Sequence, residues 1–420
     1  MVEVTTAPDA RLGRPFWALA GSSGLSNLAD GVCKVALPLL AVRMTRSPAL
    51  VAGLELVRSL PWLVGSLPVG ALVDRLDRRR SMVRANAARA AFVAVPAAAL
   101  AAGRGSLGLL YLAALGTGVA EVFYDTAGQS ILPALVPRAR LDRANGRLMA
   151  VELGAQEFAG PPVAGVLVAG GLALAFVTSS VLWALAIAAL LTVHGAFRPG
   201  RPPGAGSLGA DIREGLTFLF GRPVLRTMAV MVAMGNLANS AAFSVLVLYA
   251  VGPRSTLRLS EPRFGVVLAV LAAGGLAGGL AAGWVQRRLG RARALRLSVL
   301  GMTALLAGPA LSSSAAAVAV LFFAGGAATM VWNITTVSFR QRVTPDHLLG
   351  RVNSAYRLLA WGTRPLGAAL GGVLGQWLGV RAVFAVMGVV ATAELLPARR
   401  ITEQSLDAEE AAQGQVDTNR

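Results

Sequence analysis

The chain has 420 residues, of which 55% are hydrophobic and only 14% charged, and its formal net charge is +18. Soluble domains carry roughly 25% charged residues, and a mean hydropathy of +0.62 leaves too little polar surface to face water. The composition therefore excludes a soluble globular protein and an intrinsically disordered one, and it leaves an integral membrane protein.

Twelve apolar segments follow one another along the chain, each close to the roughly 20 residues that a helix needs to cross the hydrocarbon core. They predict transmembrane helices at residues 16–43, 49–73, 82–103, 107–133, 145–170, 172–196, 223–251, 262–286, 293–311, 314–338, 350–378 and 381–398. The polar segment 197–222 follows the sixth of these, and its DIREGLTFLF run predicts a short amphipathic helix on the membrane surface. We expect an all-α membrane protein with two six-helix bundles, 16–196 and 223–398, around a central cavity, with polar tails at 1–15 and 399–420.

Arginines gather in alternate loops between the predicted helices. The rich loops lie near residues 75–84, 138–143, 198–222, 287–293, 342–351 and 399–400. Cytoplasmic loops carry the excess of Lys and Arg, so we expect both termini in the cytoplasm of a bacterial cell whose plasma membrane holds the protein. The pI near 11.6 does not indicate a nucleic-acid partner, because the arginines lie in short clusters between apolar runs.

The two predicted halves repeat each other. VPRARLDRAN (136–145) matches TPDHLLGRVN (344–353) at an offset of 208, and GALVDRLDRRR (70–80) matches GWVQRRLGRAR (283–293) at an offset of 213. Both matches join equivalent helices of the two halves, which indicates duplication. Parallel repeats of this kind predict alternating access, in which two bundles rock about a central site.

The loop after the second predicted helix resembles the gating motif of the major facilitator superfamily (MFS): a glycine, an aspartate four residues later and a basic run. Its residues here are Gly70, Asp74, Arg75, Arg78 and Arg79, followed by Arg80. The chain is also similar to the twelve-span branch of macrolide-efflux and enterobactin-exporter-like drug:proton antiporters, through LADG (28–31), DTAGQSILPALVP (125–137) and RPLG (364–367). The resemblance implies the MFS fold and a latch that closes the cytoplasmic face. A solvated loop that only sets topology is the alternative for these arginines.

GPPVAG (160–165) in the fifth predicted helix resembles the Gly-Pro motif of antiporters. Gly160, Pro161 and Gly165 match it, whereas Ala164 and Gln156 stand where the family has glycines. The match implies export. The fourth predicted helix lacks the buried arginine that many proton antiporters carry there, which weakens the usual proton-relay assignment.

Charged residues inside the first six predicted helices are candidates for proton coupling, because a charge in the bilayer must face a cavity or a partner. Asp30 and Lys34 lie four apart on one helical face, either as a proton site with a switchable counter-ion or as a fixed pair. Glu121 and Asp125 share a face as further proton carriers, unless Asp125 lies in water at the interface. Cavity candidates in this half are Lys34, Glu55 and Arg58, the last two close enough to pair.

The second half offers polar and aromatic side chains instead. Arg357, Trp361 and Arg364 form one stripe of the eleventh predicted helix, and Asn236, Asn239 and Asn333 lie in the seventh and tenth. Arginine binds carboxylates and tryptophan stacks on flat ligands, so these residues are candidates for ligand contact. Packing between the bundles is the alternative.

These features predict proton-coupled efflux of a small amphipathic molecule, such as a macrolide-like drug, a siderophore or another natural product. An importer or uncoupled facilitator, and more remotely a transporter-like receptor or a membrane-embedded enzyme, remain alternatives. No HExxH motif, cysteine pair or histidine pair at ligand spacing occurs, so we expect no enzyme, no metal and no cofactor. The expected partners are the lipid bilayer, a small-molecule substrate and protons, with the proton gradient as driving force and a monomeric protein.

Overall fold

The computed structural model describes residues 12–73, 76–137, 140–195, 197 and 208–418. Helices dominate this part of the chain. They are α1 (Arg14–Met44), α2 (Pro48–Val73), α3 (Arg78–Ala101), α4 (Leu107–Leu135), α5 (Leu141–Leu153), the π-helical η2 (Gly154–Ala159), α6 (Gly160–Gly170), α7 (Leu172–Leu191), α8 (Leu208–Gly221), α9 (Pro223–Ala250), α10 (Glu261–Leu289), α11 (Arg291–Leu311), α12 (Ala315–Val343), α13 (Asp346–Leu378), α14 (Val380–Ala393), α15 (Leu395–Ala398) and α16 (Glu403–Thr418).

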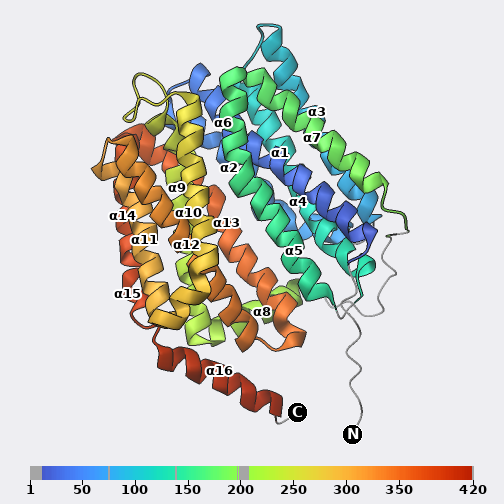
Figure 1. Cartoon of the computed structure of the whole chain (residues 1–420), viewed down its shortest axis with the longest axis vertical. Helices are drawn as coiled ribbons and strands as arrows, with labels where there is room; N and C mark the ends of the chain where they lie inside the picture. The colour runs from blue at the N-terminus through green and yellow to red at the C-terminus, as the bar shows by residue number, and fades with distance from the viewer. Residues whose placement is uncertain (1–11, 74–75, 138–139, 196, 198–207, 419–420) are drawn as a thin grey trace.

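The helices fall into two groups that lie side by side (Figure 1). The helices up to α7 form one group, and α9 to α15 form the other; we call these groups the first and second halves. Within the described residues, eight helices are long and apolar enough to span a membrane. The molecule is therefore an all-helical membrane protein.

Each predicted membrane segment is helical, with ends that differ from the prediction by about a turn. The predicted amphipathic helix is also present, as α8. Its Glu214 carboxylate accepts a hydrogen bond from Arg351 of α13 at 2.5 Å, which fastens the connecting segment to the second half. The fifth predicted helix differs from the prediction, because η2 interrupts it between α5 and α6. An insertion of this kind shifts the helical face by one residue.

Glycines allow neighbouring helices to approach closely. A Cβ built on Gly160 of α6 would lie 2.6 Å from the Cα of Gly31 in α1, and a Cβ on Gly165 would lie 2.8 Å from the Cα of Gly265 in α10. Small residues at such crossings bring helix backbones into contact. The α6–α10 contact joins the two halves, so Gly165 lies at the boundary between them.

The halves are also joined where α1 ends and α10 begins, which is the upper end in Figure 1. Arg43 donates two hydrogen bonds to the Glu261 carboxylate, at 2.8 and 2.7 Å. Arg46 donates to the carbonyl of Val251 at 3.3 Å. These contacts close the upper end, whereas α8 and α16 lie at the opposite, lower end.

Candidate functional site

The first part of the site is an ion cluster around Arg58 of α2. Its guanidinium donates to both oxygens of Glu55 one turn earlier, at 2.9 and 2.8 Å, and to Glu121 of α4 at 2.9 Å. Arg364 of α13 approaches Glu55 at 3.5 Å from the second half. We call Glu55, Arg58, Glu121 and Arg364 the Arg58 cluster. The predicted Glu55–Arg58 pair is confirmed, and the cluster spans both halves.

A second, more deeply buried set of groups lies beside it, and we call it the Arg89 network. Arg89 of α3 is fully buried and pairs with Asp30 of α1 at 3.1 Å. It also donates to Ser26 at 2.8 Å and to Asn86 at 3.2 Å, and it lies over the ring of Tyr124. Its Nε and Nη2 have no hydrogen-bond partner. A buried charged donor that is left without a partner is energetically costly.

The ion pairs in α1 differ from the expected one. Lys34 donates to Glu157 of η2 at 2.7 Å rather than pairing with Asp30. The π-helical turn explains the change, because it places Glu157 beside α1 where an uninterrupted helix would direct it elsewhere. The predicted Asp30–Lys34 pair is therefore wrong, and Asp30 has Arg89 as its counter-ion.

The sequence prediction missed Arg89 even though the third predicted helix contains it. The criterion that selected Asp30, a charge within a membrane segment, would have found it. Glu394 was missed in the same way: it lies at the end of α14 with a buried Oε1 that has no partner. α4 itself contains no arginine, but Arg89 of α3 lies over the ring of Tyr124 in α4.

The remaining predicted proton carrier, Asp125, lies in α4 one turn beyond Glu121. Glu121, Arg89, Glu152 and Asp30 all lie within electrostatic range of its carboxylate. Asp125 therefore belongs to the same polar region, at the edge of the Arg89 network.

The aromatic candidate of the second half lies at the contact between α2 and α13. Trp361 packs edge-on against Trp62 of the first half, with ring centroids 4.4 Å apart. Asn236 and Asn239 lie in α9, the latter exposed, and Asn333 is exposed on α12. Arg357 lies in α13, and its side chain is outside the description. The structure therefore brings Trp361 and Arg364 to the first half and leaves Asn239 and Asn333 apart from these contacts.

The predicted gating motif is only partly described. Gly70 lies in α2, whereas Asp74 and Arg75 fall outside the described residues. Arg78 opens α3, and its backbone N–H donates to Phe197 at 3.3 Å. Arg79 donates to the carbonyl of Leu191 at 3.3 Å. Arg78 and Arg79 thus fasten the start of α3 to the segment that follows α7.

The span-five motif has a packing role in this structure. Gly160 and Pro161 open α6, where Gly160 meets Gly31, and Gly165 meets Gly265. The motif therefore lies where α6 contacts α1 and the second half.

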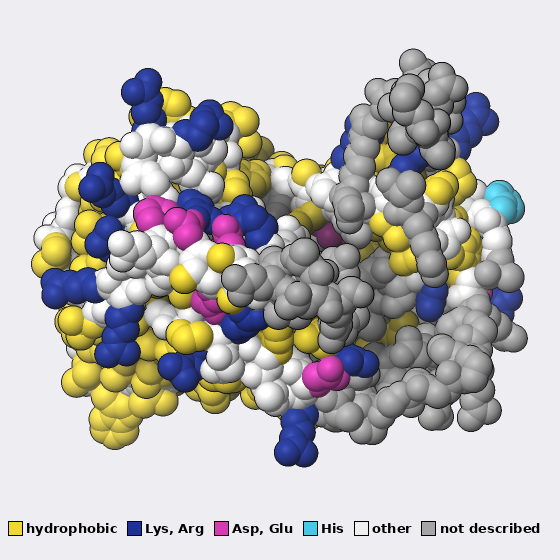
Figure 2. All heavy atoms as spheres, turned by 90° about the horizontal axis from the view of Figure 1, so that it is seen from below, with side chains coloured by type: hydrophobic (Ala, Val, Ile, Leu, Met, Phe, Trp, Pro, Cys, Tyr) yellow, Lys and Arg dark blue, Asp and Glu magenta, His cyan; other side chains and the backbone are white. Residues whose placement is uncertain are grey.

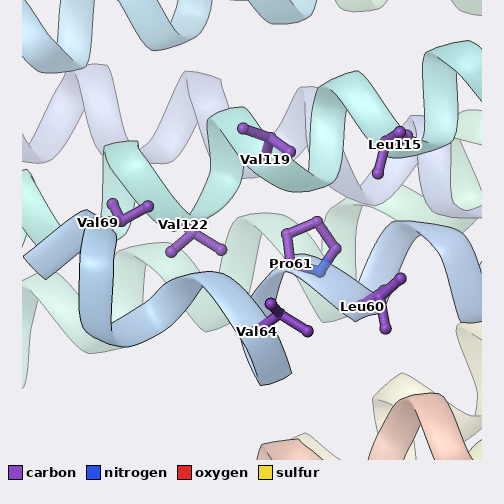
Figure 3. A pocket seen from close by; sticks show the side chains of 7 residues that line it. All are labelled: Leu60, Pro61, Val64, Val69, Leu115, Val119 and Val122. Atoms are coloured by element: carbon purple, nitrogen blue, oxygen red, sulfur yellow. The ribbon is translucent and has the colours of Figure 1, made fainter.

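An apolar groove of about 270 Å³ lies between α2 and α4 (Figure 3). Only aliphatic side chains and a proline line it: Leu60, Pro61, Val64, Val69, Leu115, Val119 and Val122. Leu60, Val64, Leu115 and Val119 are exposed, so the groove opens at the molecular surface, and its lining offers no hydrogen bond. Among the described residues, no group of three His, Cys, Asp or Glu side chains could hold a metal ion.

Figure 2 shows the lower face, with basic side chains spread over it and a hollow between its two lobes. An acidic side chain is visible deep in this hollow. The contacts between Arg43 and Glu261 and the hollow thus lie at opposite ends of the molecule.

The sequence model of the Major Facilitator Superfamily matches residues 19–363 and 255–415. The chain belongs to the Major Facilitator Superfamily. The multidrug efflux pump Tap of Mycolicibacterium fortuitum is 31% identical over 391 residues, which cover 89% of this chain and 91% of that pump. Family membership and the apolar helices together make the chain a multi-pass membrane transporter.

Solved structures share the fold of this superfamily member at low sequence identity. A bacterial homologue of the iron transporter ferroportin in an inward-facing state superposes with a TM-score of 0.71 at 17% identity, covering 93% of this chain and 99% of that one. An outward-facing state of a bacterial ferroportin homologue gives a TM-score of 0.59 at 18% identity, covering 92% and 98%. These identities carry no information on the substrate.

Proposed function

We propose that this transporter exports small amphipathic molecules in exchange for protons. The observation that carries the proposal is the pair of adjoining ion networks, in which Asp30 is held by Arg89 and Glu121 by Arg58. Asp30 is the proposed proton site, and the Arg58 cluster reaches Arg364 of the second half. A change of charge in the first half therefore alters the electrostatic interactions at the contact between the halves.

In the proposed cycle, a proton bound at Asp30 Oδ2 neutralises the carboxylate and removes its attraction for Arg89. The guanidinium then turns toward its remaining partners, Ser26 and Asn86. Asp30 lies within electrostatic range of Glu121 and Arg58. With Asp30 neutral, Arg58 interacts more strongly with Glu55 and Glu121, and it competes with Arg364 for Glu55.

The substrate acts on the same bridge from the cavity. A molecule that binds between the halves displaces Arg364 from Glu55. Its apolar part then packs against the rings of Trp361 and Trp62. Lys34, Asn236, Asn239, Asn333 and Arg357 are the further cavity candidates. Proton and substrate bias the same two-state contact, which is the requirement for coupling.

The proposed arrangement has twelve membrane crossings in two six-helix bundles, 16–196 and 223–398, with both termini in the cytoplasm. The lower end, rich in arginine, then faces the cytoplasm. The Arg43–Glu261 pair closes the outer end, and the hollow below opens inward. The larger TM-score with an inward-facing structure supports this state. The loop with Gly70, Asp74, Arg75, Arg78 and Arg79 is proposed to latch the cytoplasmic end in the opposite state.

Export is favoured over import by two observations. A relative that covers 89% of this chain is named a multidrug efflux pump, and Gly160, Pro161 and Gly165 match the antiporter-like motif. A macrolide-like drug or a siderophore fits the amphipathic site. The importer or uncoupled facilitator remains the second candidate, because alternating access itself has no direction.

The test uses inside-out membrane vesicles with an imposed pH gradient, acid inside. Erythromycin, tetracycline, ethidium and iron-free enterobactin are added in turn while a fluorescent dye reports the internal pH. We expect at least one compound to accelerate proton loss from the vesicles, with no such signal in vesicles lacking the transporter. Accumulation of a compound without any proton signal would contradict antiport and favour a facilitator.

A further inference from the structure

The C-terminal helix α16 is docked under the second half, although it follows the last apolar segment (Figure 1). Leu406 and Ile401 are buried in an apolar cluster together with Ala398 and Leu225. α16 contacts α9, α11 and α12 at their lower ends. The helix is therefore part of the folded second half.

Acidic side chains of α16 surround one arginine at the start of α11. Arg291 pairs with Glu410 at 2.6 Å and with Glu403 at 3.6 Å, and it forms a third ion pair with Asp407. Glu410 also accepts from Arg342 of α12 at 2.8 Å. In Figure 2, acidic side chains lie in a row beside basic ones on one lobe of the lower face. The Glu410 carboxylate links α11 and α12, because it contacts both Arg291 and Arg342.

Two carboxylates of α16, Glu403 and Glu409, cap the starts of α11 and α9. Glu403 accepts from the backbone N–H of Ala292 in the first turn of α11 at 2.8 Å. Glu409, which is only 7% exposed, accepts from the N–H of Val224 in the first turn of α9 at 3.1 Å. The first N–H groups of a helix lack partners inside the helix, and a carboxylate there also meets the positive end of the dipole.

The internal repeat explains why α11 needs a cap from elsewhere. An offset of 213 sets Asp77 opposite Gly290 and Arg78 opposite Arg291, and α3 and α11 begin at these two arginines. Asp77 caps α3 itself, by accepting from the N–H of Arg80 at 2.9 Å. Gly290 has no side chain to do so, and its φ of 80° disfavours any replacement that has one.

We propose that α16 is an intrachain clasp: the C-terminal tail supplies the acidic cap that the second repeat lacks and holds the lower ends of α9, α11 and α12 together as one rigid unit. The clasp engages Arg291 in the second-half counterpart of the gating loop. The two loops are therefore not equivalent, because α3 is capped by Asp77 of its own loop whereas α11 is capped by the tail. The tail moves with the second half in this scheme.

The test is hydrogen–deuterium exchange on the full-length protein in lipid nanodiscs, which needs no substrate and no transport. Glu403→Ala should raise exchange at the start of α11, and Glu409→Ala should raise it at the start of α9, each by about tenfold, the usual effect of removing a helix cap. Gln404→Ala, an exposed neighbour in α16, is the matched control and should leave both starts unchanged. The start of α3, capped by Asp77, should not change in any variant.

Two results support the clasp. Exchange that rises only at the helix each residue caps supports independent caps, and exchange that rises at both starts in both variants supports release of the tail as a unit. Unchanged exchange at both helix starts in both variants would overturn the proposal. Since the readout is local protection, this result stands whether or not export is proton-coupled.

Discussion

The buried arginine of the first half is the residue whose partners matter most. A charge at the bilayer centre costs about 2.5–3.5 kcal/mol on insertion scales, so Arg89 and Asp30 are stable there only as a pair. Arg89 is fully buried, and Asp30 has a side chain only 11% exposed. Breaking such a pair leaves an uncompensated charge in the interior, which destabilises far more than breaking an exposed pair.

Arg89→Ala should therefore lower the free energy of unfolding by about 3–5 kcal/mol, because it leaves the buried Asp30 carboxylate without a counter-ion. Arg84→Ala is the matched control, since Arg84 is an exposed arginine of the same helix. The measurement is the thermal melt of both purified variants in the same detergent. Equal melting temperatures for the two variants would contradict the paired role of Arg89.

The stability of the docked tail should depend on pH through Glu409, and the direction of its pKa shift sets the sign of this dependence. Burial raises the pKa of Glu409 above its ordinary value of 4.5, although the Val224 N–H and Arg222 oppose the shift. A raised carboxyl pKa means that the docked tail binds the proton more tightly than the free tail. The extra stability that this proton gives to the docked tail is thus present below pH 4.5 and is lost as the pH rises through the raised pKa, whereas the ionised carboxylate still accepts from Val224.

Glu409→Gln should remove this dependence while keeping an acceptor for Val224. Above pH 4.5, the protection of the α9 start in wild-type protein should fall with rising pH relative to the variant. Hydrogen exchange, corrected for its intrinsic pH dependence, measures the difference. A constant difference between the two proteins over this range would mean that Glu409 does not titrate in the docked tail.

At the scale of elements, the close contact of α2 and α4 positions the Arg58 cluster. A Cβ on Gly118 of α4 would overlap the carbonyl oxygen of Arg58. The same contact brings Glu121, one turn further on, within hydrogen-bond distance of the Arg58 guanidinium. Glycine at 118 is therefore required by the approach of the two backbones.

Gly118→Ala should separate α2 from α4 and destabilise the protein by about 1–3 kcal/mol, the usual cost of overpacking. Gly108→Ala in the first turn of α4 is the control, because its nearest neighbour to a new Cβ is the Ser106 hydroxyl at 3.9 Å. Thermal melts of the two variants give the comparison. A Gly118→Ala protein as stable as Gly108→Ala would show that α2 and α4 separate without cost.

Sequence reasoning predicted the helices well because each is a long apolar run between polar loops. It also predicted the Glu55–Arg58 pair, since residues three apart share a helical face. It did not predict the Lys34–Glu157 pair, because the π-helical turn that carries Glu157 leaves no periodic signal in the sequence. It could not anticipate α16 docking either, because the caps of α9 and α11 come from residues more than a hundred positions away.

For the whole molecule, coupling requires that one proton site and one substrate site bias the same rocking motion. The Arg89 network and the Arg58 cluster are adjacent in the first half, and Arg364 links the second half to them. The upper end is held by Arg43 and Glu261. The central claim is that Asp30 carries the transported proton while the rocking itself needs only the substrate.

The most direct test of this claim compares two transport assays of Asp30→Asn in proteoliposomes, with a compound found active in the vesicle screen. Transport driven by a pH gradient should be lost, because the amide cannot carry the proton. Exchange of labelled for unlabelled compound at equal pH should persist, because rocking with bound substrate needs no proton transfer. Gradient-driven transport that persists in Asp30→Asn would contradict Asp30 as the proton carrier and would assign that role to Glu121 or Asp125.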